Sequence, residues 1–263
     1  MQVKKGMPLK RLVVMVVISG VVAFGARVYG VDESPLATAV KEARGSLESL
    51  GLERVETEVL GRRLVYFQGG QGPTLVLLHG AGDQAGTWEP VVGALLARYR
   101  LLIPDLPGHG DSEPGEGPLD FRDVVAGSDA FIESHTPDDR PIVVGNSMGA
   151  WLAFLYALRY PEQVERVVAV NGGPISGNPE SPSLTPQDRE EARRLMALLR
   201  DPASPQLPDL VLDDIVRRTN AGPIGRLLQL PNSFAEFLMD WRLGEVSTPV
   251  ELVWGESDRL MDL

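Results

Sequence analysis

The sequence predicts an α/β fold built on a doubly wound, mostly parallel sheet. Apolar runs at residues 74–78 and 141–145 have the unbroken hydrophobicity of strands that are covered on both faces. Segments with strand and helix patterns alternate from residue 74 to residue 170, which is typical of parallel sheets. With 263 residues, 43% of them hydrophobic, the chain is long enough to bury the core of one such domain.

Each element is predicted from its own pattern. Residues 55–60 and 63–68 alternate around a turn at Gly61, which predicts a hairpin. Residues 148–160 are apolar nearly all round, as in a helix buried between a sheet and its neighbours. The remaining strands are expected at 74–78, 100–104, 141–145, 164–170 and 249–254, and the remaining helices at 88–99 and 121–135.

The alternation stops after residue 174, which predicts an insertion. Residues 175–245 are rich in Pro, Ser and Asp and hold helical pieces near 187–199, 210–218, 224–230 and 234–243. We expect them to form a helical lid. The predicted organisation is a signal peptide or membrane anchor at 1–30, a linker at 31–54, the sheet domain at 55–174, the lid at 175–245, and the sheet domain again at 246–263.

The N-terminus has the form of a secretory signal. Four basic residues precede an apolar run at residues 12–26: Lys4, Lys5, Lys10 and Arg11. The run is shorter than the roughly 20 residues of a typical membrane span, so a cleaved signal and an uncleaved tether both stay open. We expect an exported protein, either periplasmic or extracellular, or held at a membrane by this segment.

Charge and composition exclude several classes of partner. The first 31 residues hold five basic residues and no acid, and removing these charges from the net charge of −11 leaves −16 for residues 32–263. So acidic a body disfavours binding to nucleic acid or to an anionic membrane surface. Without cysteine there are no disulfides or thiolate metal sites, and no His, Asp and Glu cluster has metal-ligand spacing. No metal or cofactor is expected, and the oligomeric state stays open.

The central motif is Gly145-Asn-Ser-Met-Gly149, where a predicted strand passes directly into a predicted helix. A serine on such a turn is held in a strained conformation with its hydroxyl projecting, and the two glycines let strand and helix approach closely. Because the five-residue pattern also arises by chance, its meaning depends on what accompanies it.

Three further motifs follow predicted strands. They are His79-Gly80-Ala81-Gly82, the segment from Asp105 to Ser112, and Trp254-Gly255-Glu256-Ser257-Asp258. With these motifs in this order, residues 55–263 resemble the α/β-hydrolase fold family, in its serine esterase and lipase-like branch. The resemblance implies the predicted sheet and a helical lid, with the active site at the carboxyl ends of the strands.

The resemblance also implies roles for individual residues. Ser147 is the expected nucleophile, and the backbone N–H groups of Met148 and Ala81 are the expected oxyanion hole. Gly80 lets its loop come close to the nucleophile, and His79 is expected to support that loop rather than to act in catalysis.

Asp258 is the expected acid of the triad, because the family places a carboxylate after this late strand. Glu256 is the alternative. Other members carry the acid one strand earlier, where this chain has Asn171, which cannot serve.

The histidine of the triad should follow one further strand. The histidines here are His79, His109 and His135, all upstream of Ser147. His109 is expected to shape the pocket wall, and His135 to cap a helix. We therefore expect a sequence that is truncated at its C-terminal end, without the last strand and helix, and impaired in activity as it stands.

The expected function is a serine hydrolase that cleaves an ester or related bond of a small apolar acyl substrate through an acyl-enzyme. Two alternatives stay open. One is a carbon–carbon bond hydrolase or perhydrolase of the same fold, and the other is a non-catalytic hydrolase-like protein.

Overall fold

A computed structural model describes residues 34–176, 182–230 and 232–260. The predicted signal or anchor at residues 1–30 lies outside the described residues. Within the three described ranges, none of the helices combines the length and the apolar character needed to cross a membrane.

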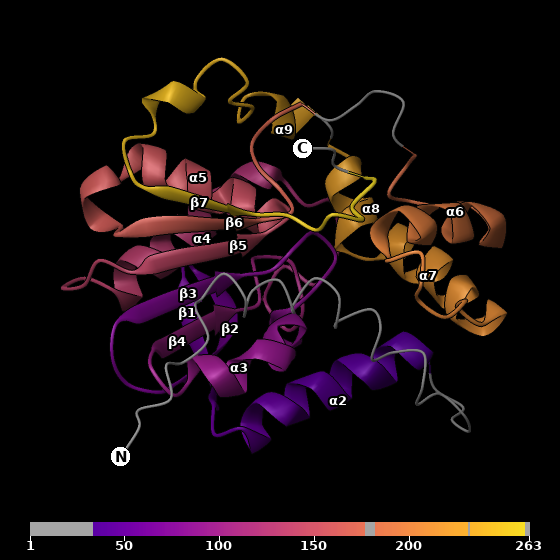
Figure 1. The fold of residues 1–263 in the computed structure, drawn as a ribbon, viewed down its shortest axis with the longest axis horizontal. Coiled ribbons are helices and arrows are strands. Elements are labelled where there is room, and N and C mark those ends of the chain that lie inside the picture. The colour runs from indigo at the N-terminus through magenta and orange to yellow at the C-terminus, as the bar shows by residue number, and fades with distance from the viewer. Residues whose placement is uncertain (1–33, 177–181, 231, 261–263) are drawn as a thin grey trace.

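The described residues form a seven-stranded sheet with the order β1-β2-β4-β3-β5-β6-β7 (Figure 1). β2 pairs antiparallel with β1 and β4, and the pairings from β4 through β3, β5 and β6 to β7 are parallel. The predicted α/β fold is confirmed. The strands are β1 (Glu53–Val59), β2 (Arg62–Gly69), β3 (Thr74–Leu78), β4 (Arg100–Pro104), β5 (Ile142–Asn146), β6 (Arg166–Val170) and β7 (Val250–Val253).

Helices cover both faces of the sheet, because successive residues of each buried strand point to opposite sides. Val76 and Leu78 of β3 pack with α4 (Phe121–His135) and α5 (Met148–Arg159). Leu75 and Leu77 pack instead with α2 (Pro35–Ser49) and α3 (Glu89–Leu95) on the other face (Figure 1). The result is three layers, with the two halves of the core on either side of the sheet.

Helix α2 differs from the expected linker at residues 31–54. Ser34 caps its first turn, Pro35 begins it, and Leu47 is completely buried against the sheet domain. Six of its 15 residues are Leu, Val or Ala, several at helical spacing, so the pattern allowed a packed helix that the expected linker did not include. Arg44 adds an ion pair with the completely buried carboxylate of Asp105.

In the part of the chain that the structure describes, four α-helices lie between β6 and β7, where the insertion was predicted: α6 (Arg189–Leu199), α7 (Asp209–Ala221), α8 (Pro223–Leu228) and α9 (Asn232–Ala235). The first two pack around a small apolar core of Ala192, Val211, Leu212 and Ile215.

The fourth helix was expected to extend to residue 243 but ends at Ala235. Beyond it the Met239 N–H donates to the Pro174 carbonyl, and the Ser176 N–H donates to the carboxylate of Asp240. These bonds to the segment that leaves β6 replace helical ones.

The junction of β5 and α5 depends on two glycines. A Cβ at Gly145 would lie 2.1 Å from the carbonyl oxygen of Gly149, and a Cβ at Gly149 would lie 2.1 Å from the carbonyl oxygen of Leu78. These distances are far below van der Waals contact with backbone atoms that cannot move independently. Gly145 and Gly149 therefore let β5 and α5 pack more closely than any residue with a side chain would allow.

This packing predicts opposite outcomes for two Gly→Ala substitutions. Gly145→Ala lowers the free energy of unfolding by about 3 kcal/mol, since the backbone must shift to admit the methyl group. Gly45→Ala on α2, where a Cβ meets nothing within 4 Å, raises it by up to about 1 kcal/mol through helix propensity. Urea unfolding of both variants measures the difference, and equal stabilities would contradict the packing argument.

Candidate active site

Ser147 lies at the junction of β5 and α5 with its side chain exposed. Its backbone has φ +52°, in the left-handed region that non-glycine residues rarely adopt. The Ser147 N–H donates to the carbonyl oxygen of Val170 at 3.0 Å, which fixes the turn to the end of β6. Within the described ranges the hydroxyl of Ser147 makes no hydrogen bond.

Two loops approach Ser147 closely. A Cβ at Gly172, just after β6, would lie 2.5 Å from the Cα of Ser147. A Cβ at Gly80, just after β3, would lie 3.3 Å from the Cβ of Ser147. The structure thus brings together the serine motif and the predicted oxyanion loop.

The two expected oxyanion donors have no competing acceptors. Neither the N–H of Ala81 nor that of Met148 donates a hydrogen bond within the described part of the chain. The Met148 N–H is free because it begins α5, where the first N–H groups have no partner inside the helix. Two unpaired N–H groups beside an exposed serine can stabilise an anion that forms there.

His79 supports the oxyanion loop through both ring nitrogens. Its Nε2 accepts from the N–H of Leu106 at 3.0 Å, so its Nδ1 carries the proton and donates to the Gly80 carbonyl oxygen at 2.8 Å. Burial lowers the pKa of His79 to about 4, so the ring is neutral at pH 7. Neither nitrogen is left to accept a proton from Ser147.

Asp258 lies beside the end of β6. Its carboxylate accepts from the side-chain amide of Asn171 and, at 3.0 Å, from the N–H of Leu260. Asn171 directly precedes Gly172, which contacts Ser147, so Asp258 lies on the side of the sheet where the serine is. The alternative acid, Glu256, is exposed.

The other two histidines are engaged elsewhere. The Nδ1–H of His109 donates to the Pro107 carbonyl at 3.0 Å, and its Nε2 is buried without a partner among the described residues. Burial and the neighbouring His79 lower the pKa of His109 to about 3. The Nδ1–H of His135 donates to the Phe131 carbonyl at the end of α4. None of the three is hydrogen-bonded to Ser147.

Helix α8 contacts the oxyanion loop and the loop after β4. A Cβ at Gly82 would lie 2.7 Å from Ile224. The guanidinium of Arg226 is largely buried and donates to four backbone carbonyls: those of Gly108, Pro114, Glu116 and Gly117. This contact was not predicted from the sequence, because a charged arginine usually faces solvent even where its neighbours are apolar.

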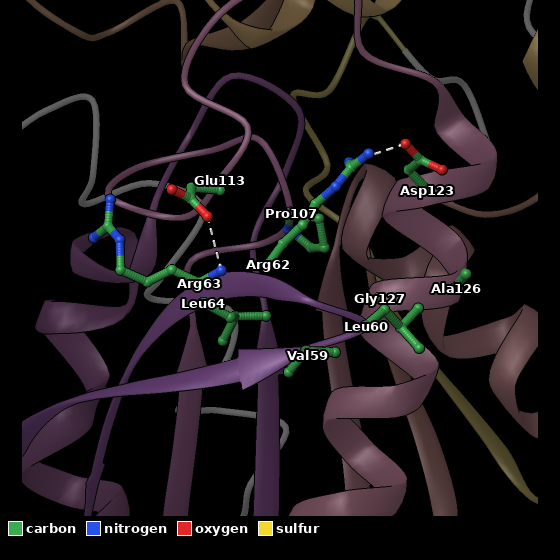
Figure 2. Close-up of a pocket in the computed structure, with 10 residues that line it drawn as sticks. All are labelled: Val59, Leu60, Arg62, Arg63, Leu64, Pro107, Glu113, Asp123, Ala126 and Gly127. Atoms are coloured by element: carbon green, nitrogen blue, oxygen red, sulfur yellow. Dashed lines mark hydrogen bonds and ion pairs between the residues drawn. The ribbon is translucent and has the colours of Figure 1, made fainter.

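The cavity shown in Figure 2, of about 130 Å³, lies elsewhere. It is formed by the β1–β2 turn, Pro107 and α4, and its mouth holds an ion pair of 3.0 Å between Arg62 and Asp123. Neither Ser147 nor Asp258 lines it. Within residues 34–176, 182–230 and 232–260, no group of three or more acidic or histidine side chains could hold a metal ion.

The comparisons with known proteins agree with this fold. The family model for the alpha/beta hydrolase fold matches residues 73–201. The chain is 30% identical over 226 residues to a 2-hydroxy-6-oxononadienedioate/2-hydroxy-6-oxononatrienedioate hydrolase of Paraburkholderia phymatum, and the match covers 76% of each chain.

The chain is also similar to a second protein in sequence and to a solved structure in fold. The chain is 27% identical to an uncharacterised protein of Mycobacterium tuberculosis, in a match covering 76% of this chain and 66% of that protein's length. A crystal structure described as a membrane phospholipase A, a bacterial virulence factor, superposes with a TM-score of 0.69 at 26% identity. That superposition covers 86% of this chain and 77% of the other.

The two buried imidazoles predict how stability depends on pH. Because the pKa values of His79 and His109 are lowered to about 4 and about 3, the unfolded chain binds more protons than the folded one below about pH 6.5. Stability therefore falls as the pH drops from 6.5 toward 4, by on the order of 3 kcal/mol for His79 alone. Unfolding by urea at several pH values, with NMR titration of the ring signals, measures this.

Asp129 provides a control of opposite sign. Burial raises its pKa to about 6, so its contribution to stability declines as the pH rises from 4 to 6. Asp129→Asn removes that contribution and makes the loss of stability on acidification steeper. If the imidazole signal of His79 or of His109 titrates near pH 6.5, the assignment of that histidine as a buried neutral group is contradicted.

Proposed function

The chain belongs to the α/β-hydrolase family, and on that premise we propose that it hydrolyses an ester or related acyl bond through an acyl-enzyme on Ser147. The observation that carries the proposal is the exposed serine in left-handed backbone between two unpaired N–H groups. An ordinary glycine turn needs neither the strain nor the free donors.

In the proposed reaction the Oγ of Ser147 attacks the carbonyl carbon of the ester. The Ala81 and Met148 N–H groups bind the oxygen as it becomes negative, the bond to the alcohol breaks, and water then releases the acid. Asp258 would orient an imidazole that takes the serine proton. None of the three histidines of this sequence is held in that way: both ring nitrogens of His79 are engaged, and the Nδ1–H groups of His109 and His135 donate to backbone carbonyls rather than to a carboxylate.

We propose a small, neutral, apolar acyl substrate. A net charge of −16 over residues 32–263 repels anionic substrates. Ester cleavage is also supported by the likeness to the structure described as a phospholipase A. The helical insertion that meets Gly82 through Ile224 is proposed as the lid over this site.

A second candidate is hydrolysis of a carbon–carbon bond, which is favoured by the name of the Paraburkholderia relative. The substrate in that name is a dicarboxylate, which the acidic body disfavours. A panel of p-nitrophenyl esters of increasing chain length, run beside a vinylogous 1,5-diketone, separates the two activities. A non-catalytic protein would turn over neither.

We also propose that the protein is exported from the cytoplasm. The basic and apolar pattern of residues 1–26 supports export, with release or tethering at a membrane. Cell fractionation with a C-terminal tag tests it, and a cytoplasmic product of unchanged length would contradict it.

Covalent labelling tests the nucleophile. With imidazole present as the base, a fluorophosphonate probe labels the wild-type protein at Ser147, because it reacts with serines that are activated and have an oxyanion hole. Ser147→Ala removes the label, whereas Ser128→Ala, a buried helix serine hydrogen-bonded to Val124, keeps it. Peptide mapping identifies the labelled residue. A label that survives in Ser147→Ala would overturn the assignment.

Chemical rescue tests the missing base. The 263-residue chain cleaves p-nitrophenyl butyrate slowly, and added imidazole accelerates it at least about tenfold beyond the same addition to Ser147→Ala, since general-base catalysis is worth 10²-fold or more. Fast turnover without imidazole that is lost in His109→Asn would instead identify His109 as the base.

A further inference from the structure

The guanidinium of Arg44, on helix α2, lies between two loops of the candidate site. Its Nη1 is 2.7 Å from Oδ2 of Asp105, and its Nη2 is 2.7 Å from Oδ2 of Asp111. It also donates to the side chain of Gln84 and covers the ring of Phe67 at 5.1 Å. Only 13% of the side chain is exposed, so these contacts are largely shielded from water.

Asp105 is the buried group that Arg44 neutralises. Its side chain is completely buried, and it also accepts from the N–H of Ala85 at 2.8 Å and of Asp111 at 2.9 Å. A buried carboxylate is costly unless it is paired and hydrogen-bonded. Through Asp105, Arg44 therefore holds the segment after the oxyanion loop and the loop after β4 in one arrangement.

A short series of bonds connects Asp105 to the expected oxyanion donor. The N–H of the next residue, Leu106, donates to His79, and His79 donates to the Gly80 carbonyl oxygen. In a trans peptide the C=O and the following N–H point in opposite directions. The Gly80 carbonyl also accepts from the Asp83 N–H at 3.3 Å, but the His79 bond is the shorter of the two, at 2.8 Å. The bonds that fix the Gly80 carbonyl thus also fix the direction of the Ala81 N–H.

We propose that Arg44 is a positioning residue for the oxyanion hole, acting through Asp105, Leu106 and His79 on the Ala81 N–H. This inference rests on the proposed function of Ser147. It assigns a role in the reaction to a helix outside residues 73–201, the span that matches the family model.

The other end of α2 is fixed to the helical insertion. The hydroxyl of Ser34 and the N–H of Leu36 both donate to the carboxylate of Asp214 on α7. Leu36 also packs against the small core shared by α6 and α7. Arg44 is therefore anchored on a helix held at both ends, as positioning a loop requires.

The experiment compares three variants. Arg44→Met removes the charge and keeps much of the bulk. Arg44→Lys keeps the charge but loses the two-pronged contact with Asp105 and Asp111. Arg54→Met is the matched control, because Arg54 also contacts Asp111, at 3.1 Å, but does not contact Asp105. None of these residues belongs to the proposed catalytic machinery.

Two rates and one affinity are measured for each protein. They are the rate constant for phosphonylation of Ser147, the rate of ester cleavage with imidazole present, and the inhibition constant of an ether analogue that has no carbonyl. Arg44→Met slows phosphonylation and cleavage at least about tenfold, less than the 10²- to 10³-fold lost with an oxyanion donor. Arg44→Lys recovers to within about threefold of wild type, and Arg54→Met stays within about twofold.

The ether analogue separates positioning from general damage. Its binding stays unchanged in Arg44→Met if only the N–H direction is lost, because an ether develops no oxyanion. Loss of ether binding in parallel with the rates, or rates equal to wild type, overturns the inference and leaves the proposed function intact. If Arg44→Met does not fold, amide exchange at residues 80–86 decides instead, because it should be faster in Arg44→Lys than in Arg54→Met.

Hydrogen exchange separates failure of the inference from failure of the proposed function. If Ser147 of the wild type is not labelled even with imidazole present, the proposed function fails. Amide exchange at residues 80–86 then still tests the positioning. Faster exchange there in Arg44→Met and not in Arg54→Met supports the connection from Arg44 to the loop, and equal exchange overturns it.

Discussion

The close approach of backbone segments around Ser147 is the constraint on which the rest of the site depends. Glycines at positions 145, 149 and 172 leave no side chain between β5, α5 and the ends of β3 and β6. That packing holds Ser147 at φ +52° with its side chain exposed, and it leaves the N–H groups of Ala81 and Met148 without acceptors among the residues that the structure describes. Strands β3, β5 and β6 and helix α5 also supply core contacts of the sheet domain. The packing of the whole domain therefore compensates the backbone strain at Ser147.

The sequence predicted those parts of this arrangement that depend on residues next to one another in the chain. Unbroken apolar runs identified β3 and β5, because a strand that is buried on both faces has apolar side chains at nearly every position. The motifs beginning at His79 and Gly145 identified the turns. Contacts between distant residues left no comparable pattern. Arg44 reaches Asp105 from 61 positions away, and Arg226 reaches Gly108 from 118 positions away. The direction of a long charged side chain is decided by the assembled fold, so periodicity could not show that these two arginines turn inward.

These two arginines hold the loop after β4 from opposite sides by different chemistry. Arg44 neutralises a completely buried carboxylate, so its contribution is chiefly electrostatic. Arg226 donates to four backbone carbonyls, so it satisfies peptide groups that an irregular loop would otherwise leave unpaired. One arginine comes from α2, which precedes the sheet, and the other from α8 in the insertion. The loop from Asp105 to Gly117 is thereby the element through which both helical parts act on the site.

The hydrogen bonds of His79 imply that different groups stabilise the oxyanion and accept the proton of Ser147 in the proposed reaction. Its Nε2 must accept from Leu106 while its Nδ1 donates to Gly80, which only a neutral ring with one defined proton can do. A ring that gained a proton from Ser147 at Nε2 would lose the Leu106 bond, which connects the oxyanion loop to the loop after β4, while its Nδ1–H would still donate to the Gly80 carbonyl. Stabilisation of the oxyanion and acceptance of the serine proton therefore cannot come from the same imidazole. Residues 79–148 hold the parts for the first task, and Asp258, bonded to Asn171 beside Gly172, is placed to orient a separate group for the second.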